Sequence, residues 1–130
     1  VEPYCFDNMI EFMQLNGVDY GVFKIINPSG SLESYGGFVK PEAMNTTPEG
    51  IPQYAGYGVI TREGLEKVGL MDENFKPIYC EDADYGLRVH EAGLKVGVCP
   101  TAALRHHHEQ AGRVFDYHHN KEYLWKKHRL

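Results

Sequence analysis

The strongest strand-forming stretch of the chain reads Tyr20-Gly21-Val22-Phe23-Lys24-Ile25-Ile26 and runs directly into the turn sequence Asn27-Pro28-Ser29-Gly30. β-branched and aromatic residues favour a strand. In the turn, proline fixes one backbone angle and glycine permits a positive one. Residues 31–39 then return as a second strand, so the pattern predicts a β-hairpin to which further strands can add.

A helix precedes this hairpin. Over residues 3–16 the large apolar side chains recur at helical spacing and form one face. That face consists of Phe6, Met9, Ile10, Phe12 and Met13. Gly17 follows, and glycine commonly ends a helix because it adopts the left-handed conformation without strain. We therefore expect the helix to end at Gly17.

A segment rich in proline follows the hairpin at residues 40–53. It carries few large apolar side chains, which predicts a loop. Loops of this length inside a compact domain are uncommon and are often functional. A functional loop and a plain connector both remain open for this segment.

Residues 54–60 predict a short strand that contains Gly56 and Gly58. Glycine inside a strand often marks a place where another group approaches the backbone closely. Arg62 follows this strand, where it can meet an anion or cap the next helix. No phosphate-loop pattern accompanies these glycines.

Two short helices are expected next. Thr61 is a suitable N-cap for the first, which should run through residue 68 with Leu65 and Val68 facing inward. The second should span residues 80–92 and end at Gly93, again because glycine terminates helices. The loop between them carries an acidic pair of residues.

The last elements are a strand and a helix. Residues 95–99 predict a strand that Pro100 interrupts and that residues 102–105 resume, and residues 111–127 have a helical pattern. Helices and strands thus alternate irregularly, which predicts a mixed α/β fold with helices flanking a mixed sheet. We expect a single domain over residues 1–130, and the boundary character of several strands predicts missing neighbours.

Composition narrows the class of protein. The 130 residues suit one domain, and 42% apolar with 24% charged residues is ordinary for a globular chain. A formal net charge of −5 argues against nucleic acid as the main partner. No apolar run approaches membrane-spanning length, so we expect no transmembrane segment. The sequence opens at Val1 without a signal-peptide pattern or an initiator methionine, which predicts a fragment or a processed product.

The cysteines and histidines are unusual in number. Three cysteines without metal-type spacing argue against a disulfide framework and favour a reducing compartment. Five of the seven histidines fall between residues 106 and 119. In an extended run, His106 and His108 would share one side. Exposed side chains and a transition-metal site both remain open for this run.

Three carboxylates, those of Glu81, Asp82 and Asp84, fall within four positions at the start of the second expected helix. One interpretation is a solvated acidic helix start, which is stabilising. The other is a functional site, either a rigidly held general base or an Asp-x-Asp pair for a hard cation. The spacing leaves both open. Arg88 stands four residues after Asp84, which predicts a structural ion pair.

Several motifs occur in a definite order along the chain. They are Gly21 to Gly30, Gly36-Gly37, Gly56-Tyr57-Gly58 with Thr61-Arg62-Glu63, Val68 to Phe75, Glu81 to Arg88, Glu91-Ala92-Gly93, Pro100, His106, Asn120 and Lys127-His128. In order and spacing this set resembles the C-terminal part of family 2 glycosyltransferases of the GT-A fold, such as rhamnosyl- and galactofuranosyltransferase-like enzymes. The resemblance covers about residues 3–128 and implies a partial GT-A fold.

The resemblance also implies roles for individual residues. Asp82 would be the general base, and Glu81 beside it would contact the acceptor or orient the site. His106, after the strand led by Pro100, would help to hold a Mg²⁺ or Mn²⁺ ion on the nucleotide diphosphate. The substrate pocket would be lined by the glycine-rich strand and its neighbours, namely Gly56, Tyr57, Gly58, Arg62 and Asp84.

The function expected from this resemblance is inverting transfer of a sugar from a nucleotide-diphosphate donor to a hydroxyl of a glycan or lipid-linked glycan. One base and one metal ion suffice for that chemistry, because the metal neutralises the leaving diphosphate. We expect a cytoplasmic location, peripheral at the inner membrane face.

The nucleotide-binding half of such an enzyme, with its own Asp-x-Asp motif, has no counterpart in the sequence. The chain alone is therefore expected to be inactive, with the missing half as a partner. Two alternatives stay open, a non-catalytic carbohydrate- or partner-binding half-domain and a histidine-rich metal-binding protein.

Overall fold

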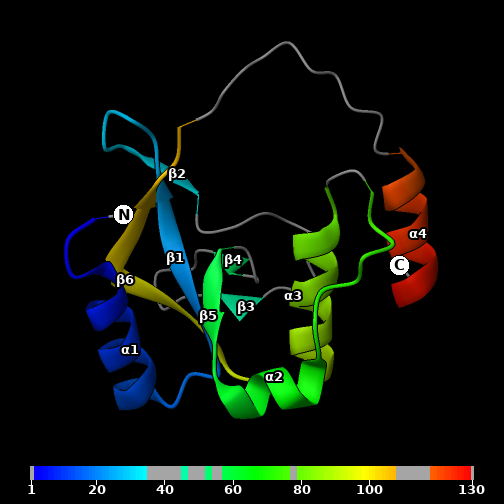
Figure 1. The fold of residues 1–130 in the computed structure, drawn as a ribbon, viewed down its shortest axis with the longest axis horizontal. Helices are drawn as coiled ribbons and strands as arrows, with labels where there is room; N and C mark the ends of the chain where they lie inside the picture. The colour runs from blue at the N-terminus through cyan, green and yellow to red at the C-terminus, as the bar shows by residue number, and fades with distance from the viewer. Residues whose placement is uncertain are drawn as a thin grey trace.

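The computed structural model describes residues 2–34, 45–46, 52–53, 57–76, 79–107 and 118–129. In chain order its elements are α1 (Cys5–Asn16), β1 (Tyr20–Ile26), β2 (Leu32–Ser34), β3 (Asn45–Thr46), β4 (Pro52–Gln53), β5 (Gly58–Ile60), α2 (Arg62–Val68), α3 (Glu81–Glu91), β6 (Val96–Arg105) and α4 (His118–His128). The predicted mixed α/β class with a mixed sheet and flanking helices is confirmed (Figure 1).

The sheet is built around β1, the strand-forming stretch of the sequence. One edge of β1 pairs antiparallel with β5 over its first half and with β2 over its second half. The other edge pairs in parallel with β6 along most of its length. The predicted hairpin of β1 and β2 is therefore present, and β3 and β4 pair separately with each other.

Strand β6 contains an irregularity at the predicted interruption. Val22 of β1 pairs with Val98, but Lys24 pairs with Ala103, so extra residues of β6 bulge out between these two pairs. Pro100 lies in this bulge, where its missing N–H removes no ladder hydrogen bond. The interruption expected at Pro100 is thus a register shift inside one strand and not a break between two strands.

The two faces of the sheet are covered by different helices (Figure 1). Helix α1 covers one face, where its methionines Met9 and Met13 pack over β1 at Gly21. A Cβ atom at Gly21 would lie 2.8 Å from the Met13 sulfur, so glycine lets this side chain pack closely on the strand. Helix α3 covers the other face, and α4 packs on the far side of α3.

Local chemistry explains most helix ends. Gly17 adopts φ 62° and its N–H donates to the Met13 carbonyl, as expected for a C-terminal glycine. Thr61 caps α2, since its side-chain oxygen accepts from the Gly64 N–H at 3.1 Å. Gly93 follows α3 with φ 72°. These predicted boundaries are confirmed.

One inward-facing residue was wrongly predicted. Leu65 is exposed, whereas Val68 packs beside the buried cluster between the sheet and α3, as expected. A helix as short as α2 has too few turns to bury both positions against one neighbour.

The described residues contain no helix with both the length and the apolar character needed to cross a membrane, in line with the expectation. Predictions for residues 35–39, for residues 54–56 including Gly56, for His108 and for residues 111–117 lie outside the described residues. So does most of the predicted loop at 40–53, whose described residues form the short strands β3 and β4.

Candidate active site

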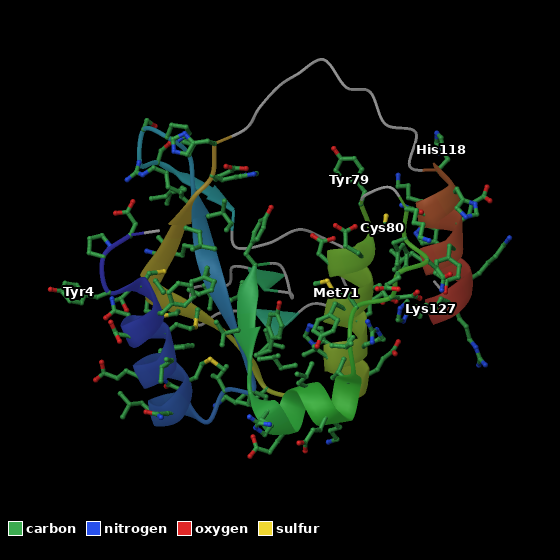
Figure 2. The ribbon with its side chains drawn as sticks, in the orientation of Figure 1. Tyr4, Met71, Tyr79, Cys80, His118 and Lys127 are labelled. Carbon is green, nitrogen blue, oxygen red and sulfur yellow. The ribbon has the colours of Figure 1, made fainter. Side chains whose placement is uncertain are left out.

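Glu81 and Asp82 occupy the first turn of α3, and both side chains are half-buried. The Asp82 Oδ1 atom accepts a hydrogen bond from the Ala83 backbone N–H at 2.8 Å. Figure 2 shows Tyr79 and Cys80 just before these residues, at the end of α3 that lies away from α2. Negative side chains here complement the positive end of the helix dipole. The predicted helix start therefore presents two carboxylates at one end of α3.

One oxygen of Glu81 is buried without a hydrogen bond. No partner lies within reach of its Oε2 atom among the described residues. A buried carboxylate oxygen without a partner is costly, and in native proteins it usually faces a bound water, ion or ligand group. This atom is therefore a favourable point of contact for a ligand that carries a hydrogen-bond donor.

Asp84, the third carboxylate of the cluster, is fully buried and has both oxygens engaged. Its Oδ2 atom lies 3.0 Å from Nε of Arg88, and its Oδ1 atom lies 2.8 Å from Nζ of Lys127. The Oδ1 atom is also 2.7 Å from Nε2 of His128. The predicted ion pair between Asp84 and Arg88 is confirmed, and these contacts support a structural role for Asp84.

Lys127 of α4 extends this network to the loop before α3. Lys127 also lies 2.8 Å from Asp72 Oδ2, which accepts a further hydrogen bond from the Tyr123 hydroxyl at 2.8 Å. Hydrogen bonds from Lys127, from the Asn74 backbone and from Tyr123 hold the pKa of Asp72 well below its usual range. Figure 2 shows Lys127 between the two helices. Helix α4 therefore clamps α3 to its preceding loop.

A buried tyrosine lies beneath the acidic helix start. Tyr20 is 4% exposed, and its ring centroid lies 6.1 Å from that of Tyr85. Burial, then the neighbouring Tyr85, then the negative charge of Asp82 raise the pKa of the Tyr20 hydroxyl. The ring of Tyr20 also lies over Gly58, where a Cβ atom would approach it to 2.5 Å. The expected close approach at Gly58 is confirmed, and the approaching group belongs to the chain itself.

His106 lies just beyond the end of β6. It contacts Glu33 of β2 and Tyr57, which precedes β5, and both of these strands pair with the other edge of β1. Its Nδ1 atom is 3.5 Å from Glu33 Oε1, and its ring centroid is 5.9 Å from that of Tyr57. An imidazole next to a carboxylate is a donor set that Mn²⁺ accepts. Among the described residues, however, no group of three or more histidine, cysteine or acidic side chains gathers as metal ligands would. These residues do not complete a metal site by themselves.

The predicted substrate-binding residues are not all brought together. The His106 N–H donates to the Ile26 carbonyl at the end of β1, whereas Arg62 follows Ile60, which pairs with Tyr20 at the start of β1. Arg62 is exposed in the first turn of α2. The register therefore places Arg62 and His106 at opposite ends of the sheet, and the substrate role of Arg62 stays a prediction.

Several residues around the acidic cluster were given no role by the sequence. Asn120, Lys127 and His128 are among the motif residues named from the sequence, but their spacing alone does not predict a contact with α3. The structure brings all three against α3 or the turn before it. Tyr20 carried no signal beyond its strand propensity, because its contact with Gly58 depends on the pairing of β1 with β5.

Comparison of the chain with protein-family models, with curated proteins and with solved structures found no match.

Proposed function

We propose that this chain is the acceptor-side part of an inverting GT-A glycosyltransferase, which moves a sugar from a nucleotide-diphosphate donor to a hydroxyl of a glycan or lipid-linked glycan. The observation that carries the proposal is the half-buried pair Glu81 and Asp82 at the start of a helix anchored by the buried carboxylate Asp84. The order of motifs along the chain supports the same reading.

Asp82 is the general base in this proposal. As the acceptor oxygen attacks the anomeric carbon, Asp82 takes its proton, and the nucleoside diphosphate leaves from the opposite face of the sugar. Such a base works only when it is held at a fixed distance from the hydroxyl that it deprotonates. The ion pairs of Asp84, one helical turn or less away, supply that rigidity.

Glu81 binds the acceptor in this proposal. Its buried Oε2 atom lacks a hydrogen-bond partner among the described residues. A sugar presents several hydroxyl donors, and one of them would satisfy this oxygen while a second faces Asp82. Because a buried acceptor regains a lost hydrogen bond on binding, the contact favours hydroxyl-bearing ligands over apolar ones. Tyr57 and Gly58 complete the proposed pocket, which also includes Gly56. Asp84 supports it from within, because its buried carboxylate is fully engaged.

The donor requires groups beyond those described. A Mg²⁺ or Mn²⁺ ion would neutralise the diphosphate, with His106 as one ligand and the remaining ligands supplied by a nucleotide-binding part. That part is proposed as the partner of this chain, on a further segment or a second polypeptide. The proposed location is the cytoplasmic side of a membrane that carries the acceptor.

The test is the Asp82→Asn variant of the complete enzyme, that is, this chain together with its nucleotide-binding part. Loss of a general base lowers kcat by about 10²- to 10⁴-fold, whereas KM for the donor should stay within about threefold because the base does not bind the nucleotide. Glu63→Gln is the matched control, because Glu63 also lies in the first turn of a helix and is exposed on α2.

Steady-state kinetics with each substrate varied in turn would decide the assignment. Near-normal turnover in Asp82→Asn removes Asp82 from the base role. Glycan binding without any transfer by the complete wild-type protein would instead identify a carbohydrate-binding half-domain. Glu81→Gln should chiefly raise KM for the acceptor, because the uncharged amide accepts a weaker hydrogen bond from a sugar hydroxyl than the carboxylate does.

A further inference from the structure

The turn before α3 is held in a strained conformation. Tyr79 and Cys80 adopt φ values of 79° and 72°, in the left-handed region that residues other than glycine rarely occupy. Cys80 is also the N-cap of α3, yet its side chain makes no capping hydrogen bond. Two consecutive residues in this region persist only where surrounding contacts fix them, and such strain is often found at functional sites.

One contact that holds this turn comes from α4. Asn120 is 1% exposed, and its Nδ2 atom donates a hydrogen bond to the Tyr79 carbonyl at 3.1 Å. The other end of α4 is anchored independently, through Lys127 and His128 on Asp84. Asn120 is therefore a fixed donor, and the Tyr79 carbonyl is held against a helix that is itself immobilised.

The orientation of the turn decides where the two accessible carboxylates point. Tyr79 and Cys80 immediately precede Glu81 and Asp82, and the Cys80 carbonyl accepts the first hydrogen bond of α3, from the Asp84 N–H at 2.9 Å. Asp84 anchors the helix separately, through Arg88 of α3 and Lys127 of α4. If the turn relaxed, the first residues of α3 would reorient while the remainder of the helix kept its place.

We propose that Asn120 is a positioning residue, which holds the Tyr79–Cys80 turn in its strained form and thereby sets the direction of Glu81 and Asp82. This inference rests on the proposed function for its catalytic consequence. The structural part of the inference, that Asn120 fixes the turn, can be measured separately from activity.

Cys80 provides that readout. It is the half-buried cysteine of the chain, whereas Cys5 and Cys99 are 2% and 0% exposed. Burial, together with the nearby charges of Asp82 and Glu81, raises the pKa of the Cys80 thiol, so its alkylation in the native protein should be slow. The rate of that reaction therefore reports directly on the turn next to the two carboxylates.

The experiment compares Asn120→Asp with wild type in the complete enzyme. The substitution keeps the side-chain shape, but a carboxylate cannot donate to the Tyr79 carbonyl. We expect Cys80 alkylation to be roughly 5- to 10-fold faster, as for loss of one hydrogen bond. We also expect kcat to fall about tenfold or more, with little change in KM for the donor, because the base is displaced and not removed.

Two further variants separate positioning from general stability. His119→Ala changes the exposed neighbour of Asn120 on the same helix and should alter neither rate. Tyr79→Gly relieves the strain at one of the two positions, because glycine adopts positive φ freely. In that background Asn120→Asp should have a smaller effect on both alkylation and kcat.

The outcomes distinguish the two proposals. If Asn120→Asp lowers the melting temperature but leaves the native-state alkylation rate and kcat unchanged, Asn120 is only a structural residue and the inference is overturned. If alkylation accelerates while Asp82→Asn shows near-normal turnover, Asn120 holds the turn but the proposed base is wrong. Faster alkylation with a selective fall in kcat supports both.

Discussion

The two faces of the sheet are covered by helices held in opposite ways. Helix α1 packs through an apolar cluster without a buried charge among its members, formed by Cys5, Met9, Met13, Val18, Phe23, Cys99 and Ala102. Helix α3 packs on the sheet through apolar residues as well, but on its outer side the fully buried Asp84 joins it to Lys127 and His128 of α4.

The apolar contacts hold α1 on the sheet, whereas the polar contacts also fix the direction of α3. Apolar burial is non-directional, so the α1 face can adjust side-chain positions at little cost, above all with flexible methionines. A buried carboxylate with cationic partners tolerates no such adjustment, because each lost contact leaves a charge without compensation. The directional contacts lie on the side of the sheet that carries Glu81 and Asp82, where the proposed chemistry needs a fixed geometry.

The largest expected effect comes from breaking the buried network. Asp84→Asn should lower the free energy of unfolding by about 3–5 kcal/mol, because Lys127 and His128 then lose a buried carboxylate. Equilibrium urea denaturation measures the change. Glu91→Gln is the control, because Glu91 also contacts His128 but is 57% exposed, and such pairs contribute about 1 kcal/mol or less. Equal losses in the two variants would show that the buried Asp84 contributes no more to stability than the exposed Glu91.

A smaller difference in stability is expected between alanine substitutions at two glycines of neighbouring strands, Gly21 of β1 and Gly58 of β5. A Cβ atom at Gly58 would meet the Gly21 carbonyl and the Tyr20 ring, each at 2.5 Å, and a backbone atom cannot yield. A Cβ atom at Gly21 would meet the ends of the Met9 and Met13 side chains, which can. Overpacking costs about 1–3 kcal/mol, so Gly58→Ala should fall at the upper end of that range and Gly21→Ala at the lower end.

The melting temperatures of these two variants provide the measurement. A Gly21→Ala variant less stable than Gly58→Ala would show that the α1 face is the more rigid one. Gly58→Ala should also displace Tyr20 from beneath Asp82, which Gly21→Ala should not do.

The smallest effect expected is a local response to acid. Folding lowers the pKa of Asp72, so its contribution to stability is fully present above the unfolded value of about 4 and is lost as the pH falls toward the lower folded value. The network around α4 should therefore loosen in acid before the apolar α1 face does. Hydrogen exchange at pH 3, corrected for intrinsic rates, should be faster in peptides from α4 than in peptides from α1. Asp72→Asn should reduce this pH dependence.

Much of the fold follows from local chemistry in the sequence. Strand β1 has the predicted bounds, and the ends of α1, α2 and α3 follow from Gly17, Thr61 and Gly93. These features depend on neighbours only a few residues away. The single strand β6 did not follow, because its continuation past Pro100 depends on pairing with β1, which is distant in the sequence.

The candidate site was predictable only in part. The helix start with Glu81 and Asp82 and the ion pair of Asp84 with Arg88 follow from spacing within one helix. The contacts of Asp84 with α4 join residues 43 and 44 positions apart, and no local pattern encodes them. The hydrogen bond from Asn120 to the Tyr79 carbonyl could not be predicted from the sequence for the same reason.

The contacts between Asp84 of α3 and α4 also have a consequence for the order in which the chain folds during synthesis. His128 follows Asp84 by 44 residues. At roughly 5–20 residues per second, translation leaves Asp84 without its α4 partners for about 2–9 s. Strand β6 is complete only at residue 105, so the sheet and α1 can assemble while the remaining 23 residues up to His128 are made, which takes about 1–5 s at the same rate. The nascent chain therefore acquires its apolar face first, and the acidic helix start reaches its final orientation only when α4 docks.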